Sequence, residues 1–560
     1  MKRAMFKAPM RKPTPARTLL ASAALAAALL ATAAGAPPPL VPPATLYKPL
    51  GTDWSIYAGD YTNQRFSHLT QVNRDTVKQL SLAWVAHVNS ATRDAITGGE
   101  GKGDFPVSGA SIKGAVLETS GMLFATSPDH VWALDARDGR ELWHFFWKTR
   151  GGTHITSRGS AIWNDSLLFL TADNFMVSLD ARTGRENWHV EIADFNQQYF
   201  TTSAPIVIGD QVLVGTGNDS DAPGFLQSYD PRTGKRNWIF YTVPMNKGDA
   251  GLDTWPNVDA ARHGGGHTWI PGAYDPDTDL YIFGTGNPSP AYTGVARPGD
   301  NLFTCSLLAV TVSTGKLAWY YQTSPHDTHD WDSAQPPIIF DAMINGKPRK
   351  LVATAARNGY FFTLDRVTGE HLVTSQYGAT VNWTRGLRKG GQPDRDPMKD
   401  AQIAGALVSP TEDGVVNYQA PAFNPDLGYF YVNESDSFNI VYLTDPDPRG
   451  SMGLGGKRRA VLGNASTALQ AIDARTGKTA WRHEWPQAPS LGGGLLNTAT
   501  GVLFTGDGNG NFVALDAANG APLWHTRIGN LSNAPETYQL DGRQYVLAGV
   551  GDTLYAFVLN

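Results

Sequence analysis

An eleven-residue pattern that recurs along the chain constrains the fold more than any other feature of the sequence. In each copy an alternating apolar stretch leads to an aspartate, a turn containing glycine follows, and a returning stretch ends in tryptophan. The copies include ALDARDGRELW, SLDARTGRENW and AIDARTGKTAW, and they end at Trp143, Trp188, Trp238, Trp319, Trp481 and Trp524. The stretch Thr363–Val373 is a copy without the tryptophan, and a degenerate copy ends at Trp84.

Each copy predicts a β-hairpin. The aspartate can accept hydrogen bonds from turn amides, and the Thr-Gly or Asn-Gly step supplies the positive φ of a tight hairpin. Successive turn aspartates are 45 residues apart from Asp135 to Asp180 and 50 apart from Asp180 to Asp230. This interval holds about four short strands, which is one propeller blade. We therefore expect an all-β protein, a β-propeller of roughly six to eight blades with eight preferred, whose tryptophans dock the repeats. Two β-sandwich domains are the alternative.

The N-terminal segment has the features of a secretory signal peptide. Basic residues precede an Ala/Leu run from Leu19 to Leu30, and small residues in an A-x-A pattern follow. The run is too short to span a membrane, so we interpret residues 1–33 as a cleaved signal that ends at Ala33. Because no cysteine follows the run, no lipid anchor is expected. Residues 34–560 would then form a single domain in the periplasm.

The charge and the cysteine content limit the classes of partner and of cofactor that this chain can bind. Removing residues 1–33 takes away six basic and no acidic residues, which changes the formal charge from −5 to −11. An acidic protein is a poor nucleic-acid binder. Cys305 is the single cysteine, which excludes a disulfide framework, a Cys-based metal site and a C-x-x-C-H haem attachment. Any haem that accepts electrons must therefore belong to another protein.

The stretch PHDTHDWDS (Pro325–Ser333) concentrates chemically active side chains, and Gly-rich loops elsewhere add Asp219, Trp269, Asn287 and Arg357. Each of these residues alone has a plain structural reading, as a turn residue, a solvated charge or a core tryptophan. His326 and His329 lack a second matching pair, which disfavours a histidine-based metal site. Asp and Asn oxygens suit a hard cation such as calcium. With an arginine and a tryptophan they describe a pocket for a flat, polyanionic cofactor, in which the metal polarises a carbonyl and a carboxylate removes a proton.

These loops and the repeated A-x-D-x-x-T-G-x-x-x-W pattern resemble the pyrroloquinoline quinone-dependent alcohol dehydrogenases, the quinoprotein family of methanol and ethanol dehydrogenases. The resemblance runs from about Trp54, in WSIYAGDYTNQRFSHLTQVN, to the C-terminus, and several independent loops match in the same order. It implies an eight-bladed propeller with the quinone on its axis.

The resemblance also implies roles for individual residues. It makes Asp330, in PHDTHDWD, the catalytic base. The implied cofactor-binding residues are Lys113, Arg158, Thr202, Trp269, Arg357 and Asn433. The implied metal ligands are Asp219, Asn287, Asp330 and Asp332.

Four features depart from the family pattern. The family's metal-binding glutamate is replaced in a loop one residue shorter, where Asp219 is the best match and Asp221 the second. Lys113 stands where many relatives have a glutamate, and the family's adjacent cysteine pair is absent. An aromatic residue that often lines the substrate pocket is missing near Leu491–Gly494, which suggests a wider or altered pocket.

Asp332 bears on the identity of the metal. Residues two apart in an extended segment point the same way, so Asp330 and Asp332 could face one ion. Lanthanide-using relatives have an aspartate at this second position, whereas calcium-using relatives have a small or neutral residue. Because a trivalent ion favours the extra negative charge, we favour a lanthanide over calcium. Alternatively, Asp332 is a solvated aspartate of a surface loop.

We expect a periplasmic quinoprotein dehydrogenase that oxidises an alcohol to the carbonyl. Its electrons would leave to a separate c-type cytochrome or a similar acceptor, and a homodimer is left open. A quinoprotein for sugars or polymeric alcohols and a non-catalytic propeller scaffold are the competing functions.

Overall fold

The computed structural model describes residues 38–88, 111–150, 156–217, 220–333, 335–450, 453–461, 466–486, 488 and 491–560. The chain divides into two units, Met1–Leu40 and Val41–Asn560, and the second contains every described strand. The expected signal segment lies outside the described residues. Within the described part of the chain, no helix is both long and apolar enough to cross a membrane.

The described residues of the larger unit form eight sheets of four or five strands. The first sheet consists of β3 (Leu117–Thr119), β4 (Met122–Ser127), β5 (His130–Asp135) and β6 (Glu141–Phe146). The second consists of β7 (Ser160–Trp163), β8 (Ser166–Leu170), β9 (Phe175–Asp180) and β10 (Glu186–Glu191). The third consists of β11 (Ile206–Ile208), β12 (Gln211–Gly215), β13 (Phe225–Tyr229) and β14 (Arg236–Tyr241). The next two are β15 (Ala273–Asp275), β16 (Leu280–Gly284), β17 (Ser306–Thr311) and β18 (Lys316–Gln322); and β19 (Ile338–Ile344), β20 (Lys347–Ala355), β21 (Tyr360–Asp365) and β22 (His371–Gln376).

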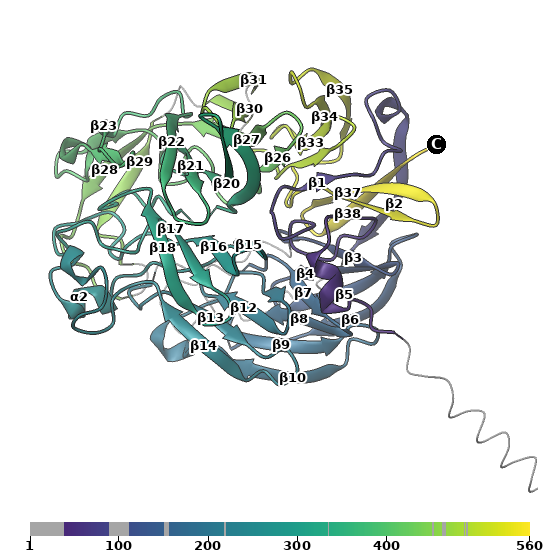
Figure 1. Ribbon diagram of the computed structural model, residues 1–560, viewed down its shortest axis with the longest axis horizontal. Coiled ribbons are helices and arrows are strands. Elements are labelled where there is room, and N and C mark those ends of the chain that lie inside the picture. Colours follow the sequence, from purple (N-terminus) through teal and green to yellow (C-terminus); the bar gives the residue numbers. More distant parts are fainter. Residues whose placement is uncertain are drawn as a thin grey trace, which may run out of the picture. The chain divides into compact units, whose positions relative to one another are not determined.

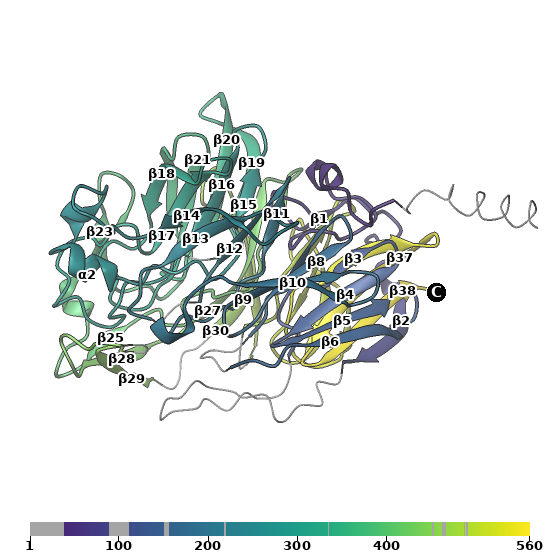
Figure 2. The same cartoon turned by 90° about the horizontal axis from the view of Figure 1, so that it is seen from below.

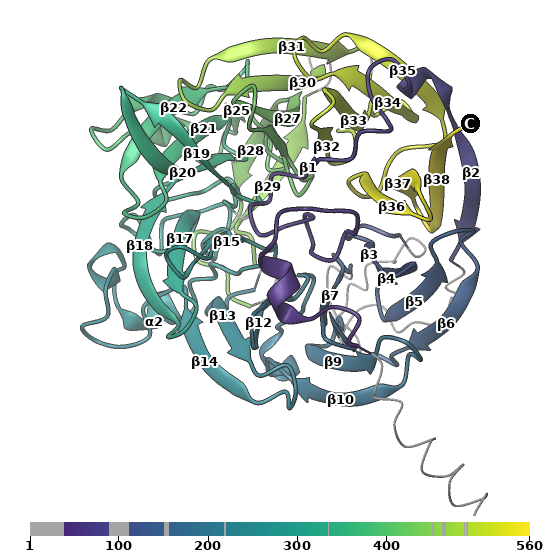
Figure 3. The ribbon, with the colours of Figure 1, turned by 45° about the vertical axis from the view of Figure 1, so that its right-hand side comes forward.

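The last three sheets combine segments that are distant in sequence. The sixth sheet consists of β26 (Ala422–Asn424), β27 (Tyr429–Asp436), β30 (Ser466–Asp473) and β31 (Thr479–Trp485). The seventh consists of β1 (Phe66–Ser67), β32 (Leu496–Thr498), β33 (Val502–Gly506), β34 (Asn511–Asp516) and β35 (Pro522–Arg527). The eighth consists of β2 (Leu80–His87), β38 (Thr553–Leu559), β37 (Arg543–Val550) and β36 (Glu536–Leu540). Strand β2, from the start of the unit, pairs antiparallel with β38 at its end. Figure 3 shows the sheets arranged radially around a common centre.

Two smaller sheets lie outside this series. They are the hairpin of β23 (Thr384–Leu387) and β24 (Pro393–Arg395), and the three-stranded sheet of β25 (Ala406–Val408), β28 (Asn439–Leu443) and β29 (Gly456–Ala460). Helical structure in the described residues is limited to α2 (Val258–Arg262) and the 3₁₀ turns η2 (Pro43–Tyr47), η3 (Val77–Gln79), η4 (Phe195–Gln197), η5 (Leu252–Thr254) and η6 (Pro397–Lys399). The prediction of an all-β protein is therefore confirmed (Figure 1).

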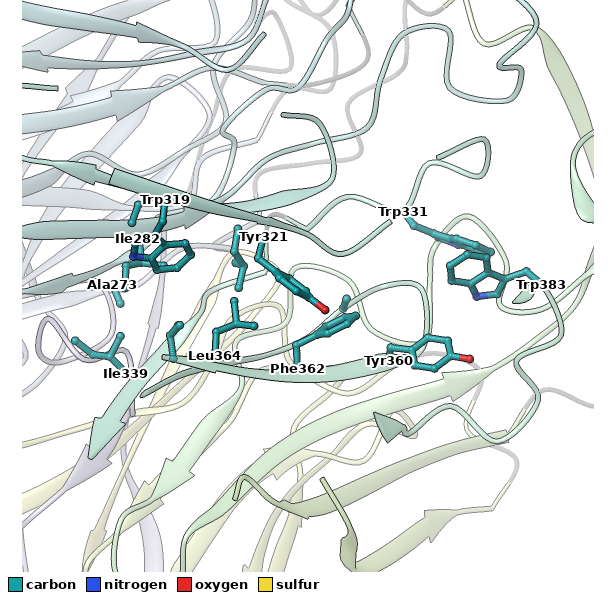
Figure 4. Close-up of a cluster of buried hydrophobic side chains, with 14 of the residues drawn as sticks. Ala273, Ile282, Trp319, Tyr321, Trp331, Ile339, Tyr360, Phe362, Leu364 and Trp383 are labelled. Atoms are coloured by element: carbon teal, nitrogen blue, oxygen red, sulfur yellow. The ribbon is translucent and has the colours of Figure 1, made fainter. Parts of the chain in front are cut away.

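Burial follows the position of each strand in its sheet. The inner strand β9 is buried along its centre, whereas the outer strand β10 alternates between exposed and half-buried residues. Consecutive sheets share hydrophobic clusters: one cluster joins β15–β18 to β19–β22 through Trp319, Tyr321 and Phe362 (Figure 4). Inner strands therefore carry apolar residues on both faces, because each face packs against a neighbouring sheet.

The turn of each repeat has the hydrogen bonds expected from its sequence. In the copy that ends at Trp188, Asp180 Oδ1 accepts the amides of Arg182 at 3.0 Å and Thr183 at 2.9 Å. Gly184 follows with φ +71°, in the region that favours glycine.

The tryptophan of one repeat packs on the turn glycine of the next. A Cβ built on Gly184 would meet Trp143 at 2.6 Å, and Gly139, Gly234, Gly315, Gly369 and Gly520 face the preceding Trp84, Trp188, Trp238, Trp319 and Trp481 in the same way. The indole Nε1 of Trp143 also donates to the Ala181 carbonyl at 3.1 Å. Where a repeat lacks its tryptophan, Val373 and Ser375 face Gly477 instead. The docking predicted for the tryptophans thus joins each repeat to the one that follows it.

A repeat glycine must adopt a positive φ and must also leave room for a neighbouring indole. Gly184→Ala and Gly346→Ala test these two requirements separately. Gly346 has φ +74° but nothing within 4 Å of an added Cβ, whereas Gly184 faces Trp143. We expect both changes to cost about 1–2 kcal/mol of backbone strain, and Gly184→Ala to cost about 1–3 kcal/mol more from the clash with the indole. Denaturant unfolding of the two variants measures the difference. Equal losses of unfolding free energy would show that the indole contact contributes nothing.

Candidate active site

Loops that follow or connect strands of two neighbouring sheets bring several predicted site residues together. Asn287 follows β16, Asp332 lies between β18 and β19, and Arg357 follows β20. Asp332 Oδ2 accepts hydrogen bonds from Trp269 Nε1 at 3.0 Å and from Arg357 Nη1 at 2.7 Å, and its Oδ1 accepts the backbone amide of Asn287. Trp269, Asn287 and Arg357, which come from separate sequence motifs, therefore meet at the carboxylate of Asp332.

Trp331 anchors the segment that carries both aspartates. Its ring is buried at the end of the cluster in Figure 4, 4.7 Å from the Trp383 ring, and its Nε1 donates to the Thr411 carbonyl at 2.9 Å. Because Trp331 lies between Asp330 and Asp332 in the chain, its burial restricts where the two carboxylates can lie.

Asp327 shapes the turn that precedes them. Its Oδ2 accepts three successive backbone amides, those of His329 at 3.3 Å, Asp330 at 3.0 Å and Trp331 at 3.2 Å. Asp330 has φ +66°, so the expectation of an extended segment is wrong. A carboxylate that collects consecutive amides favours a turn over a strand.

Asp330 and Asp332 nevertheless approach the same guanidinium. Arg357 lies 3.6 Å from Asp330 Oδ2 through Nη2 and 2.7 Å from Asp332 Oδ2 through Nη1. The Asp332 side chain is fully buried, whereas that of Asp330 is 15% exposed. Of the two carboxylates, Asp330 is therefore the one that a molecule entering the site can reach.

Burial and charge oppose each other at this cluster. Burial raises the pKa of Asp332, and Arg357 and the Asn287 amide act against this shift. Arg458 lies close enough to Asp330 for the two charges to interact: burial lowers the pKa of Arg458, and the charge of Asp330 opposes that change. Arg458 also forms an ion pair with Glu412.

A second group of residues combines cations with aromatic rings. The Arg158 guanidinium lies 4.5 Å from the centre of the Trp269 ring and 5.5 Å from that of Tyr418, and its Nη1 donates to the Thr202 carbonyl at 3.2 Å. Lys113 Nζ lies 5.9 Å from the Tyr418 ring. Burial lowers the pKa of Arg158 to about 10 and also lowers that of Lys113, because burial disfavours the charged forms.

A pocket adjoins this group and encloses about 470 Å³ with its opening counted. Its lining includes Tyr57, Arg65, Lys113, Tyr418, Gly492 and Glu536. Asn433 lies behind the pocket wall, where its Nδ2 donates to the Gly493 carbonyl at 2.7 Å and to Thr505 Oγ1 at 2.9 Å. Glycines at the predicted position of a missing aromatic residue, Leu491–Gly494, thus line this pocket.

Buried polar atoms remain available at the site. Among the described residues, Asn287 Oδ1, Asn433 Oδ1 and Arg158 Nε have no hydrogen-bond partner. Buried polar groups of this kind usually have one, so they indicate where a ligand could bind.

The predicted metal ligands are brought together only in part. Asn287, Asp330 and Asp332 lie in one cluster, whereas Asp219 falls outside the described residues. Asp221, the second choice for that position, accepts the Gly450 amide at 2.8 Å and lies 3.6 Å from His263 Nδ1. Across the ranges that the structure describes, no three or more His, Cys, Asp or Glu side chains gather as a metal-binding group.

Sequence reasoning missed Tyr418 and the role of Asp327. Tyr418 lies in no repeat and no recognisable motif, so no sequence signal pointed to it. Asp327 is part of the acidic cluster, and its position three residues before Asp330 is typical of an aspartate that caps a turn. His329 stacks on Trp331 at 4.2 Å and its Nε2 contacts the Lys399 carbonyl at 2.9 Å, which is a structural role.

Comparisons with known proteins identify the family of the chain. A family model described as glucose/ethanol/alcohol dehydrogenase, beta-propeller domain, matches residues 54–379. A second model, described as outer membrane protein assembly factor BamB, matches residues 465–558. The quinoprotein alcohol dehydrogenase PedH of Pseudomonas putida is 31% identical over 515 residues, which cover 86% of this chain and 83% of PedH.

Solved structures give the same result. The quinohemoprotein alcohol dehydrogenase from Comamonas testosteroni matches with a TM-score of 0.81 and 28% identity, covering 93% of this chain and 82% of the other. A europium-containing methanol dehydrogenase matches with a TM-score of 0.78 and 26% identity, covering 92% and 99%. The β-propeller expected from the repeats and the resemblance drawn from the loops are both confirmed.

Asp327→Ala tests whether this carboxylate holds the turn. The variant leaves three amides without their acceptor, so we expect a loss of about 1–3 kcal/mol in unfolding free energy and faster hydrogen exchange at His329, Asp330 and Trp331. Asp327→Asn keeps one acceptor oxygen and serves as the matched control, with most of the protection retained. Unchanged exchange in Asp327→Ala would show that the turn forms without this side chain.

Proposed function

Because the chain belongs to the glucose/ethanol/alcohol dehydrogenase β-propeller family, we propose that it oxidises an alcohol to the aldehyde or ketone with pyrroloquinoline quinone as its cofactor. The observation that carries the proposal is the meeting of a partly exposed carboxylate, Asp330, with the buried Arg357–Asp332 pair and the adjacent Arg158–Trp269 stack. An acid-base group and a binding surface for a flat anion thus adjoin each other.

The residues present fit such a cofactor. Lys113 and Arg158 supply positive charge for its carboxylates, and Trp269 and Tyr418 supply aromatic faces beside them. Arg357, Thr202 and Asn433 complete the set of residues that would bind it. The free oxygen of Asn433 and the free Nε of Arg158 are available for hydrogen bonds. When bound, the quinone would accept the hydride from the alcohol carbon, and a metal at its carbonyl would make that carbonyl a better acceptor.

The proposed metal ligands are Asp219, Asn287, Asp330 and Asp332. Asn287 Oδ1 is buried without a partner among the described residues, and the backbone amide of Asn287 donates to Asp332, so this residue adjoins the Asp332 carboxylate. Two carboxylates near one asparagine oxygen suit a hard cation, and a third from Asp219 would raise the negative charge further. The charge of such a set favours a trivalent lanthanide over calcium.

The chain's own residues would act on the alcohol in the following way. Asp330 accepts the hydroxyl proton as the carbonyl forms, since its side chain is the accessible carboxylate of the cluster. Arg357 holds Asp330 and Asp332 in place through its two terminal nitrogens. Trp331 and Asp327 keep the Asp330 backbone in its turn, so the base does not have to be ordered at the moment of reaction.

The same family assignment also accounts for the propeller, the N-terminal segment and the electron acceptor. The eight sheets would be the eight blades of one propeller that spans residues 34–560, with β2 and β38 closing the ring. Residues 1–33 would be cleaved on export to the periplasm. Electrons would pass to a separate c-type cytochrome or a similar acceptor, since this chain has no haem attachment motif.

Asp330→Asn tests the base. We expect alcohol oxidation with an artificial dye to fall about 10²–10⁴-fold, because the amide cannot accept the proton. The quinone absorbance of the purified protein should stay, which separates catalysis from cofactor binding. Asp413→Asn, an exposed aspartate in a neighbouring loop, is the control and should leave the rate unchanged. Full activity in Asp330→Asn would exclude this residue as the base, and no dye reduction by the wild type with any metal would exclude the enzyme.

Asp332→Ala tests the choice of metal. We expect the quinone-loaded wild type to turn over faster with lanthanum than with calcium, and the variant to lose that advantage. Because the variant also removes one of the two ion pairs of Arg357, binding is measured separately by europium luminescence. Removing a negative ligand should weaken europium binding about ten-fold or more. Activity with calcium alone that persists in Asp332→Ala would contradict the lanthanide assignment.

A further inference from the structure

The three-stranded sheet β25–β28–β29 separates the candidate site from a distinctive exposed face. Cross-strand pairing puts Val408 opposite Asn439 and Val441 opposite Ala406 and Arg458, so these residues share one face. Val408, Asn439, Val441 and Arg458 line a hollow together with His329 and Glu412. This inner face therefore lies beside His329, the residue that precedes Asp330 in the chain.

The other face of the same sheet is open and apolar at its centre. Leu407 pairs with Ile440, and Ile440 pairs with Arg459, so the three share the outer face. Leu407 is 46% exposed, and the adjoining Ile403 and Met398 are 86% and 72% exposed. The turn Gln402–Gly405 and the 3₁₀ turn η6 connect them: Gln402 Nε2 donates to the Pro397 carbonyl at 3.3 Å, and Lys399 Nζ donates to the Leu407 carbonyl at 3.0 Å. We call Met398, Ile403, Leu407 and Ile440 the outer apolar patch.

Basic residues border this patch. Lys457 and Arg459 are exposed on β29, and Lys399 lies on η6. Among the described residues, no acidic side chain lies within ion-pair distance of Lys399, Lys457 or Arg459. Of the nearby acids, Asp394 and Asp400 are paired with Arg388 and Arg395, and Asp396 caps η6 by accepting the Met398 amide at 3.0 Å.

This charge differs from that of the whole chain. The sequence has a formal net charge of −5, and Asp445 and Asp447 are the acidic residues beyond the end of β28. Large exposed aliphatic side chains bordered by uncompensated cations are typical of a docking site, with an apolar centre and a charged rim.

The outer apolar patch lies close to the residues of the candidate site. His329, next to Asp330, contacts the Lys399 carbonyl through Nε2 at 2.9 Å, and Thr328 donates to Asp400 at 2.9 Å. A single sheet therefore lies between the outer apolar patch and the hollow beside His329, a layer of about 10 Å. Figure 2 shows β25, β28 and β29 side by side at the edge of the unit.

We propose that the outer apolar patch and its basic rim are the docking surface for a small electron-accepting protein with an acidic rim around its own exposed redox edge. This inference rests on the proposed function, since oxidation of one alcohol releases two electrons and two protons. Two one-electron acceptors are reduced in turn for each alcohol, and the protons leave to solvent. Opposite charge brings the acceptor to the face, and the aliphatic side chains set its orientation.

Plastocyanin, a small acidic blue-copper protein, is the probe, and mitochondrial cytochrome c is the basic comparison. The quinone- and metal-loaded full chain should reduce plastocyanin with a higher kcat/KM than cytochrome c. Raising the salt from about 20 to about 300 mM should lower the plastocyanin value steeply. In Lys457→Glu/Arg459→Glu, we expect kcat/KM for plastocyanin to fall about ten-fold or more while dye reduction stays at the wild-type rate.

Two further variants complete the design. Lys235→Glu/Lys316→Glu changes two exposed lysines in distant repeat turns and should leave plastocyanin reduction within about two-fold of wild type. Ile403→Asp tests the apolar centre and should weaken binding of oxidised plastocyanin to the immobilised chain about ten-fold. Because binding is measured without turnover, the docking test stands even if the alcohol activity fails, and absent dye reduction counts only against the proposed function.

The contrary outcomes are equally specific. Equal losses in the β29 and control variants would overturn the proposal, because net charge alone would then explain them. Faster reduction of cytochrome c than of plastocyanin would exclude an acidic partner. If Ile403→Asp dissociates a dimer in light scattering and leaves plastocyanin binding intact, the patch is an interface between two copies of this chain.

Discussion

The contact between one repeat's tryptophan and the next repeat's glycine is the interaction on which the rest of the structure depends. A hairpin cannot bury its apolar faces alone, so each sheet needs a neighbour on both sides. The indole supplies a large apolar surface, and the glycine allows it to approach the turn while adopting the positive φ that the turn requires. The same contact recurs at six repeat glycines between Gly139 and Gly520, and at Gly477 Val373 and Ser375 take the place of the indole. It joins successive sheets and therefore sets where the ends of their strands lie.

That spacing creates the candidate site. Asn287, Asp332 and Arg357 follow or connect strands of two adjacent sheets, and their loops meet because those sheets share a core. A fully buried carboxylate such as Asp332 is costly unless it is paired, and here a guanidinium, an indole and a backbone amide satisfy it. The partly exposed Asp330 next to it then has a rigid support. The buried ion pair that links these loops thus also supports the candidate site.

Much of this could be predicted from local sequence. The repeats predicted strands, turns and docking tryptophans, because each depends on residues within about eleven positions of one another. Asp330, Asp332, Asn287 and Arg357 were recognisable because they lie in short, distinctive loops. Tyr418 was not, since its place beside Trp269, Arg158 and Lys113 follows from packing between remote segments. The extended geometry assumed for Asp330–Asp332 was wrong because the Asp327 carboxylate competes for the local amides.

The sequence by itself determined the β class, the repeat unit, the tryptophan docking and most of the residues that meet at the candidate site. Those properties depend on residue type and on near neighbours in the chain. The tertiary structure alone decided that Arg357 bridges the two aspartates, that Arg158 lies between Trp269 and Tyr418, and that one sheet has a face toward the site and a face toward solvent. Each of these relations joins residues separated by tens to hundreds of positions, and only the packing of whole sheets brings them within contact distance.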